Sequence, residues 1–388
     1  MPYVYSRDLG LKGPEMTIKE KLFHISWLFV LSITLVASVG FIMLYSAAKG
    51  NLDPWADRQI ARFGIGFIIM LLFAMIDIRK WLKYSGFIYL MSLILLVVVE
   101  IEGSIGMGAQ RWINFGFFYI QPSEIMKIAL ILYLAKYFHG STLQEIEQTR
   151  HLMYPIFLIL LPVALVMKQP DLGTAMLLLM GGSSILFLVG VQSWKFLVAG
   201  GVGLSLIPIA WQFLREYQKQ RVLTFLDPTR DPLGSGYHII QSQIAIGSGG
   251  VFGKGFLKGT QSHLDFLPEK QTDFIFTMLA EEFGMIGCIT LIALYLVIIT
   301  YGYLIAFRSQ NFFGKILGIG ITTNFFLYFF INIAMVIGLV PVVGVPLPLI
   351  SYGGTAMMTL MAGFGLVLCV HVHKDIQIGK RGSSEDFF

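Results

Sequence analysis

Apolar residues fill most of this chain in unbroken runs that are long enough to cross a lipid bilayer. A span needs roughly 17 to 25 apolar residues of helix, and these runs lack the spaced polar positions of a water-facing helix. They predict ten transmembrane spans, near residues 23–47, 59–77, 84–101, 122–138, 152–167, 172–190, 194–213, 283–306, 315–340 and 350–371.

The composition agrees with this pattern, since 56% of the residues are hydrophobic and only 13% are charged. So few charges could not cover the surface of soluble domains built from 388 residues. We therefore expect an all-α polytopic membrane protein, with membrane lipid as a partner.

The basic residues of the short loops predict how the chain is oriented. Lys and Arg accumulate in cytoplasmic loops, and here they precede the first span and follow the second at Arg79, Lys80 and Lys83. Both termini are therefore expected in the cytoplasm. The net charge of +5 follows this topology rule and forms no basic block, so we expect no nucleic-acid partner.

This topology leaves one long hydrophilic stretch outside the cytoplasm. A structureless loop of that length is unusual, so we expect short interfacial helices within it. The first apolar run is too long for a signal-peptide core and is expected to be a retained signal-anchor. The single membrane domain then comprises a cytoplasmic tail (1–22), seven helices (23–213), a large periplasmic loop (214–272), three helices (273–371) and a second cytoplasmic tail (372–388).

Two common kinds of site are not supported by the sequence. Cys288 and Cys369 lie inside predicted spans, where packing is their expected role, so they indicate neither a disulfide framework nor a metal site. The stretch Ser248–Gly255 resembles a P-loop, but it lacks the first glycine and has Gly255 where the motif requires Ser or Thr. We therefore expect no nucleotide cofactor.

Asp273 lies just before an apolar run and has two interpretations. With Thr272 it could cap a helix and complement the helix dipole. Alternatively it serves chemistry: the run from Phe283 to Phe307 is long enough to span the bilayer alone, so residues 273–282 would add about 15 Å of helix at the outer interface. A carboxylate at headgroup depth can act on the head of a lipid-linked substrate.

Other polar residues lie at membrane depth or at the ends of spans. Glu124 and Lys127 share one helix face in the fourth span, either as a structural ion pair or as a functional site. Asp171 separates two spans, either as a helix cap or as a site carboxylate. The proline- and glycine-rich segment 341–354 cannot be a regular span, and such backbone is tolerated only inside the protein or along a cavity.

Six short motifs in this order resemble the SEDS family (shape, elongation, division and sporulation) of bacterial peptidoglycan glycosyltransferases. Each motif is short, but together they extend over much of the chain with a matching topology. They are Gly108-Ala-Gln-Arg-Trp112, Gln121-Pro-Ser-Glu-Ile-Met-Lys127, Gln169-Pro-Asp-Leu-Gly-Thr174, Phe266-Leu-Pro-Glu269, Thr272-Asp-Phe-Ile-Phe276 and Pro348-Leu-Ile-Ser-Tyr-Gly-Gly354.

The resemblance implies that Asp273 is the essential aspartate and that Glu124 and Lys127 are the family's buried charged pair. It implies polymerisation of lipid II, the undecaprenyl-diphosphate-linked disaccharide peptide, at the periplasmic side of the bacterial inner membrane. It also implies a class B penicillin-binding protein as partner. No Ser-x-x-Lys signature set of a transpeptidase is apparent in the chain itself, so cross-linking would come from that partner.

The chemistry of this reaction suggests a role for each charged group. A diphosphate leaves without protonation when cations stabilise it, so one carboxylate, Asp273, can suffice as general base. Arg111, and either Arg215 or Lys219, would bind the diphosphate, and Mg²⁺ or Mn²⁺ could share that task. Further substrate contacts are expected from residues beside these groups, namely Trp112, Gln169, Asp171 and Glu269.

Two other functions fit the same topology. A flippase for the lipid-linked precursor would also need many helices and intramembrane charges, but no inverted repeat is visible. A non-catalytic scaffold would leave the outer carboxylate without a role.

Overall fold

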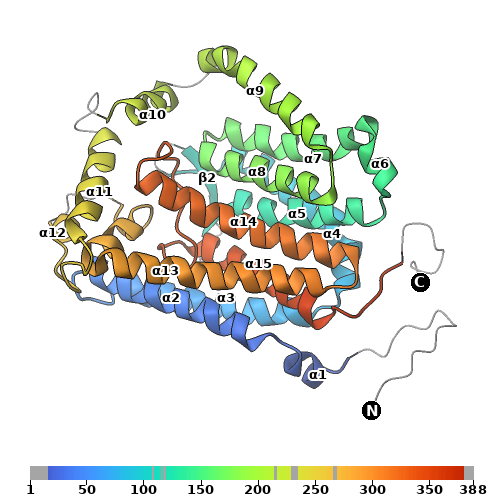
Figure 1. The fold of residues 1–388 in the computed structure, drawn as a ribbon, viewed down its shortest axis with the longest axis horizontal. Helices are drawn as coiled ribbons and strands as arrows, with labels where there is room; N and C mark the ends of the chain where they lie inside the picture. The colour runs from blue at the N-terminus through green and yellow to red at the C-terminus, as the bar shows by residue number, and fades with distance from the viewer. Residues whose placement is uncertain are drawn as a thin grey trace.

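The computed structural model describes residues 16–379 except 107–108, 115, 117–118, 214–215, 229–234 and 265–268. Long helices lie side by side in a bundle (Figure 1). The helices are α1 Ile18–Phe23, α2 Trp27–Ala47, α3 Ala56–Met75, α4 Ile78–Glu102, α5 Pro122–His139, α6 Leu143–Glu147, α7 Thr149–Lys168, α8 Leu172–Val189, α9 Ser193–Phe213, α10 Glu216–Leu226, α11 Ser235–Gly249, α12 Thr260–His263, α13 Ile275–Arg308, α14 Phe312–Val336 and α15 Gly354–Val372.

Eight of the described helices are long and apolar enough to cross a membrane, namely α2, α3, α4, α7, α8, α13, α14 and α15. The protein is therefore a multi-pass membrane protein. The other two predicted spans coincide with α5 and α9. Helix α5 carries Glu124, Lys127 and Lys136, and the apolar part of α9 ends at Ile209. Among the spans, α14 and α15 are the most buried, and they form the centre of the bundle.

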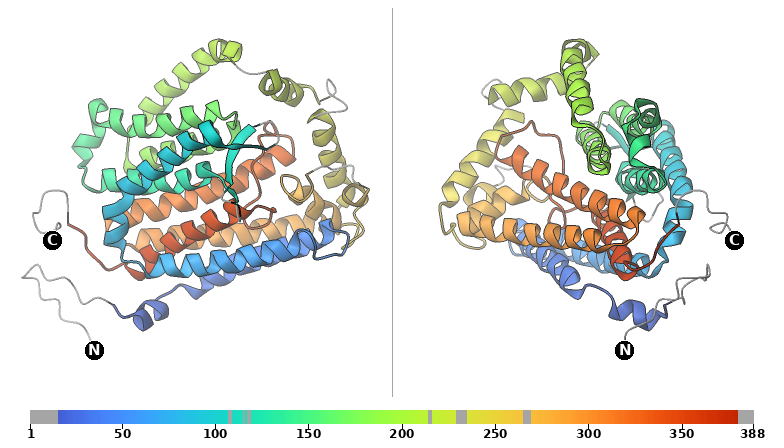
Figure 2. Two further views of the ribbon diagram at one scale, coloured as in Figure 1. Left: turned by 180° about the vertical axis from the view of Figure 1, so that it is seen from behind. Right: turned by 45° about the vertical axis from the view of Figure 1, so that its right-hand side comes forward.

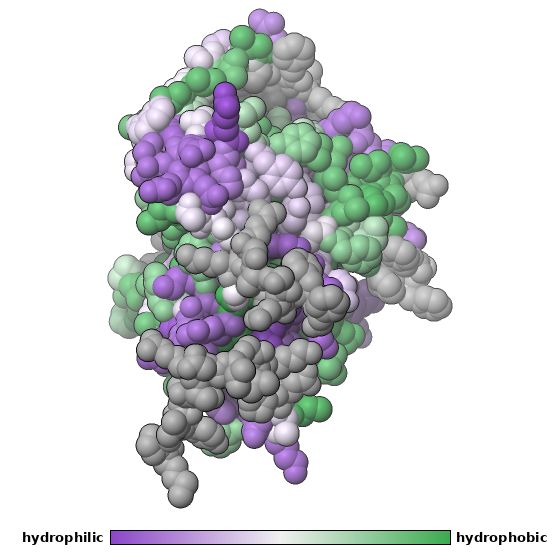
Figure 3. All heavy atoms as spheres, turned by 90° about the vertical axis from the view of Figure 1, so that its right-hand side faces the viewer, coloured by the Kyte–Doolittle hydropathy of each residue, from purple (hydrophilic) through white to green (hydrophobic). Residues whose placement is uncertain are grey.

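The described ends of the chain lie at one end of the bundle, here called the inner end. Lys21 Nζ donates to Met75 O over 2.7 Å, and Gln310 N donates to Lys374 O over 2.8 Å. Hydrophilic side chains gather on this face, with apolar ones along its edges (Figure 3). This arrangement agrees with the even number of spans that the sequence analysis predicted.

A small sheet joins α4 to α5, although the sequence analysis predicted only helices. Its strands β1 Ser104–Gly106, β2 Ala109–Asn114 and β3 Tyr119–Ile120 are antiparallel, in the order β1-β2-β3. Thr355 at the start of α15 donates its hydroxyl to Tyr119 O over 3.0 Å. The sheet therefore closes over the opposite end of the bundle, here called the outer end.

The predicted short helices of the hydrophilic loop are present as α10, α11 and α12. Helices α9 and α10 lie at the margin of the bundle, and α11 and α12 lie near the start of α13 (Figure 2). The sequence analysis expected about 15 Å of helix before the span at 283–306, and α13 does begin at Ile275. The break inside α13 was not predicted: the backbone of Gly284 is not helical (φ 64°, ψ −159°) and divides α13 into two segments.

The glycine-rich stretch after α11 completes the hydrogen bonds that the break in α13 leaves open. Met285 N donates to Gly250 O over 2.9 Å, and Lys254 N donates to Glu281 O over 3.0 Å. Within the membrane, broken backbone must find such partners inside the protein. This is the structural role of the stretch that superficially resembled a P-loop.

We predict that Gly284→Ala lowers the stability of the protein by at least about 2 kcal/mol, because only glycine adopts this backbone conformation readily. An added Cβ would also lie 2.4 Å from Gly253 N. Thermal unfolding in detergent measures the effect. Gly64→Ala is the matched control, because a Cβ there meets open space within α3, and it should be neutral or slightly stabilising. Equal melting temperatures for the two variants would contradict the prediction.

Candidate active site

Asp273 lies at the outer end, in a turn between Glu269 and the first residue of α13. Thr272 N donates to Glu269 O over 3.0 Å, and the Thr272 hydroxyl donates to Glu269 Oε2 over 2.7 Å. From the segment before α15, Ser351 Oγ donates to Thr272 O over 2.6 Å. The backbone on the N-terminal side of Asp273 is thereby held from two directions.

The helix-capping interpretation of Thr272 and Asp273 is wrong. The N-cap of α13 is Phe274, and no side chain caps it. The Asp273 carboxylate forms no hydrogen bond or ion pair with any residue that the structure describes. It is thus a partly buried carboxylate with no structural duty in this part of the chain.

The surroundings of Asp273 favour its protonated form. Burial, followed by the nearby negative charge of Glu269, raises the pKa of Asp273 to about 6. The positive charges of Arg221 and Arg111 lower this pKa, and Asp171 raises it. A carboxyl group with a pKa near neutrality can accept a proton from a substrate at physiological pH and release it again.

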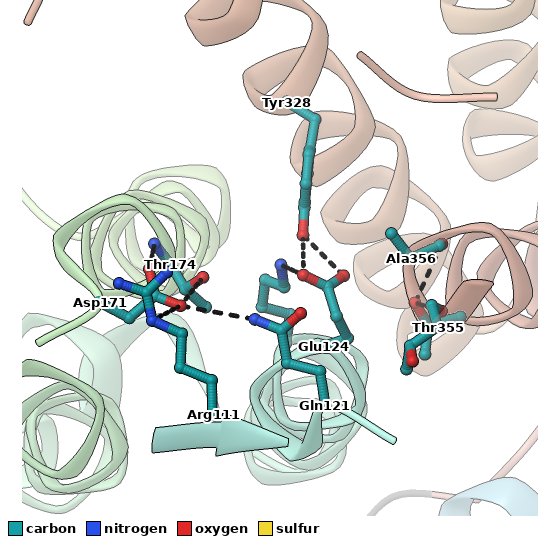
Figure 4. A network of polar contacts seen from close by, with 10 residues as sticks. Arg111, Gln121, Glu124, Asp171, Thr174, Tyr328, Thr355 and Ala356 are labelled. Atoms are coloured by element: carbon teal, nitrogen blue, oxygen red, sulfur yellow. Dashed lines mark hydrogen bonds and ion pairs between the residues drawn. The ribbon is translucent and has the colours of Figure 1, made fainter. Parts of the chain in front are cut away.

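Arg111 and Asp171 form a second polar group at the outer end, drawn in Figure 4. Arg111 extends from β2, donates from Nη2 to Pro170 O over 2.7 Å, and places Nε 3.6 Å from Asp171 Oδ2. Asp171 caps α8 by accepting from Thr174 N over 3.2 Å, which confirms the cap interpretation. The Arg111 side chain remains 27% exposed, so its guanidinium can still meet a ligand.

Glu124 and Lys127 form the buried pair that the helix spacing suggested. Lys127 Nζ lies 2.7 Å from Glu124 Oε1, and both residues are buried in α5. Tyr328 of α14 points toward Glu124 (Figure 4), and its hydroxyl lies 2.8 Å from each carboxylate oxygen. The Lys127 ammonium also lies 4.1 Å from the centre of the Tyr328 ring. The pair therefore joins α5 to α14.

The remaining predicted substrate residues have different positions. Gln169 is buried and donates to Leu96 O over 2.8 Å, so its amide already links α7 to α4. Trp112 follows Arg111 on β2, and successive strand residues point to opposite faces. Lys219 is half-buried on α10, and Arg215 lies outside the described residues.

Arg221 is a cation near Asp273 that the sequence analysis did not assign to the site. It donates from Nη1 to Val342 O over 3.3 Å, and its charge acts on Asp273. The basic run that contains it was visible in the sequence. Which of its three cations acts on Asp273 was not visible, because cations at spacings of two and four residues do not define one helix face.

Glu281 and Glu282 are structural carboxylates. Glu281 is fully buried, and its Oε1 accepts from Lys254 Nζ over 2.8 Å and from Thr260 N over 2.8 Å. Glu282 accepts from the Ser46 hydroxyl of α2. Both groups hold the loop and helices around the break in α13, which distinguishes them from Asp273.

Comparison with known proteins identifies relatives over nearly the whole chain. A family profile described as cell cycle protein, covering FtsW, RodA and SpoVE, matches residues 22–376. The peptidoglycan glycosyltransferase MrdB of Escherichia coli is 46% identical over 340 residues, which cover 86% of this chain and 91% of MrdB. Stage V sporulation protein E of Bacillus subtilis is 35% identical over 353 residues, covering 88% and 96%.

Two solved structures share the fold. A chain from a peptidoglycan synthase complex that coordinates polymerization and crosslinking has a TM-score of 0.78 and 31% identity, covering 90% of this chain and 98% of that one. The rod shape determining protein RodA of Thermus thermophilus has a TM-score of 0.68 and 26% identity, covering 91% and 98%.

We predict that changing either Glu124 or Lys127 alone to Ala destabilises the protein by about 3 to 5 kcal/mol, because the remaining charge is buried without its partner. Exchanging the two residues should recover part of this loss. Lys168→Ala is the control: its ion pair with Glu100 is largely exposed and should contribute less than about 1 kcal/mol. Unfolding in detergent tests the series, and single variants as stable as the control would contradict the prediction.

Proposed function

Because the chain belongs to the cell cycle protein family of FtsW, RodA and SpoVE, the SEDS family, we propose that it polymerises lipid II with Asp273 as general base. The chain is a peptidoglycan glycosyltransferase of the MrdB/RodA type. The similarity to named glycosyltransferases favours the polymerase function over the flippase function that the sequence analysis left open. One observation carries the role of Asp273: it is a partly buried outer-end carboxylate without a hydrogen bond or ion pair in the described structure.

The proposed reaction transfers a glycan from one lipid to another. Asp273 accepts the proton of an acceptor sugar hydroxyl, whose oxygen forms a new bond to the anomeric carbon of the donor. The bond from that carbon to the diphosphate breaks, and its electron pair leaves with undecaprenyl diphosphate. Because a diphosphate is a good leaving group, cations that stabilise its charge can replace a second, protonating carboxyl.

The cations for this task lie on two elements near Asp273. Arg111 on β2 keeps part of its guanidinium exposed, and Arg221 on α10 lies close enough to lower the pKa of Asp273. Lys219, and Arg215 by sequence, add positive charge at the same end. These groups can hold the diphosphates of donor and acceptor while the head sugars reach Asp273.

A divalent cation fits this site only together with the substrate. In the described residues, no three His, Cys, Asp or Glu side chains converge to hold a metal ion. Mg²⁺ is commonly bound by one or two carboxylates plus substrate phosphates, and Glu269 or Asp171 could supply the carboxylate. The ion would then neutralise diphosphate charge, and no other step requires it.

We further propose that the protein lies in the bacterial cytoplasmic (inner) membrane, that its site faces the periplasm, and that it serves cell elongation and rod shape. The basic inner end is consistent with this orientation. Its partner would be a class B penicillin-binding protein. A solved structural neighbour comes from a peptidoglycan synthase complex that couples polymerization to crosslinking.

The purified protein with this partner, supplied with lipid II and a divalent cation, should make long glycan strands without nucleotide. Gel separation of labelled product measures strand formation, and EDTA tests the role of the cation. Fluorescent lipid II in vesicles provides the opposing test. Translocation of lipid without any polymer would favour a flippase.

Asp273→Asn should lower polymerisation at least about a hundredfold, which is the usual scale for losing a positioned base. The variant should keep its melting temperature, because the carboxylate has no partner among the described residues. In the wild type, kcat/KM should fall below about pH 6 as Asp273 becomes protonated. Asp57→Asn, which changes an exposed carboxylate in the first turn of α3, should leave activity and pH profile unchanged.

If Asp273→Asn keeps more than about a tenth of wild-type polymerisation, the base must be another carboxylate. Glu269 would then be the next residue to test. Asp171 and Glu281 follow it, since both already serve the fold as a cap and a loop anchor.

A further inference from the structure

Asn332 is a fully buried polar residue in the central helix α14, close to Asp273. Its Nδ2 donates to Asp273 O over 3.1 Å and to Val345 O over 2.7 Å. An amide nitrogen has two hydrogens, so both donors are used. Each bond leads to a different irregular segment, one before α13 and the other between α14 and α15.

The Asn332 oxygen has no partner. Oδ1 is buried and accepts no hydrogen bond in the described structure. Reversing the amide would set Oδ1 against two carbonyl oxygens, so the two acceptors determine its orientation. An apolar side chain of similar size would remove the unsatisfied oxygen, but it would also leave Asp273 O and Val345 O without this donor. What Asn332 supplies, and an apolar residue cannot, is the link between Asp273 and Val345.

The segment bound through Val345 is also the one against which the Asp273 carboxylate lies. Gly344 has φ +71°, and a Cβ at this position would lie 3.6 Å from Asp273 Oδ2. The amide of Asn332 therefore fixes the main chain of Asp273 and, through Val345, the backbone beside its carboxylate. One side chain therefore holds the main chain of Asp273 and also the backbone that its carboxylate lies against.

We propose that Asn332 is the positioning residue of the active site and holds the Asp273 carboxylate in place against the segment 342–345. The proposal rests on the proposed function of Asp273 and adds the group that sets its geometry. We call the two hydrogen bonds from Asn332 to Asp273 O and Val345 O the clamp. A positioned base loses much of its effect when it moves by about 1 Å, so the clamp would govern kcat more than substrate binding.

Loss of the clamp should also change the titration of Asp273. The charged groups that act on this carboxylate are Glu269 in the preceding turn, Arg221 on α10, Arg111 on β2 and Asp171 at the start of α8. Burial is the largest influence and raises the pKa of Asp273 to about 6. A carboxylate released from the segment 342–345 gains solvent, so its pKa should fall toward the ordinary range of an aspartate.

The experiment compares Asn332→Leu with Asn311→Leu. Asn311 is another buried Asn, immediately before α14 at the inner end, where it caps the helix and donates to Ile376 O over 3.2 Å. Carbodiimide labelling of Asp273 across pH, read by peptide mass spectrometry, reports its protonation without requiring activity. Polymerisation kinetics across pH provide the second measurement, and detergent melting gives the stability of each variant.

Asn332→Leu should lower kcat by at least about tenfold and move the labelling midpoint of Asp273 to lower pH by at least about half a unit. Asn311→Leu should lower the melting temperature and leave both quantities unchanged. A folded Asn332→Leu variant with the wild-type midpoint and kcat would overturn the proposal. Equal changes in both Asn variants would also overturn it, because they would indicate general destabilisation.

Gly344→Ala tests the clamp if Asn332→Leu does not fold. It strains the same segment through its positive φ and keeps Asn332, so it should shift the labelling midpoint of Asp273. An unchanged midpoint would overturn the clamp. The role of Asp273 as base is judged separately by Asp273→Asn: an active Asp273→Asn variant refutes the base, whatever the labelling shows.

Discussion

Hydrogen bonds between irregular segments at the outer end hold the candidate active site together. Tyr352 N donates to Gln271 O over 2.8 Å, and Gln59 Nε2 of α3 donates to Ser351 O over 2.9 Å. Lipid offers no partners for backbone groups, so segments that leave the helical conformation must satisfy one another inside the protein. This requirement ties the turn that carries Asp273 to the segment before α15, and through Gln59 to α3.

Buried carboxylates must likewise find partners inside the protein, and this explains their different roles. Glu124 is paired with Lys127, Asp171 caps α8, and Glu281 anchors the glycine-rich loop. Each of these groups is buried and compensated, because a buried charge without a partner is costly. Asp273 lacks such a partner among the described residues, and the cost appears as a raised pKa that suits a proton acceptor. The carboxylates with structural partners are thus different from the one proposed to be the general base.

Most of the membrane architecture could be read from apolar run length. The runs located helices such as α7 and α8, which are divided at Gln169-Pro170-Asp171. The prolines and glycines also predicted that the segment before α15 is irregular. The break in α13 could not be read in this way. It depends on Gly284 meeting the stretch 250–255, and hydrogen bonds from one distant segment to another have no local pattern. The three short strands were missed because each is only two to six residues long.

The sequence by itself determined that the protein spans a lipid bilayer and that Glu124 and Lys127 share a helix face. It also determined which ionisable residues lie at membrane depth. Composition and helical period are local properties, so they need no fold to be read. Only the tertiary structure decided that Asp171 serves as a cap, that Asp273 does not, and that Arg221 and Asn332 lie beside Asp273. These relations depend on which faces of separate helices meet, and packing settles that only when the whole bundle forms.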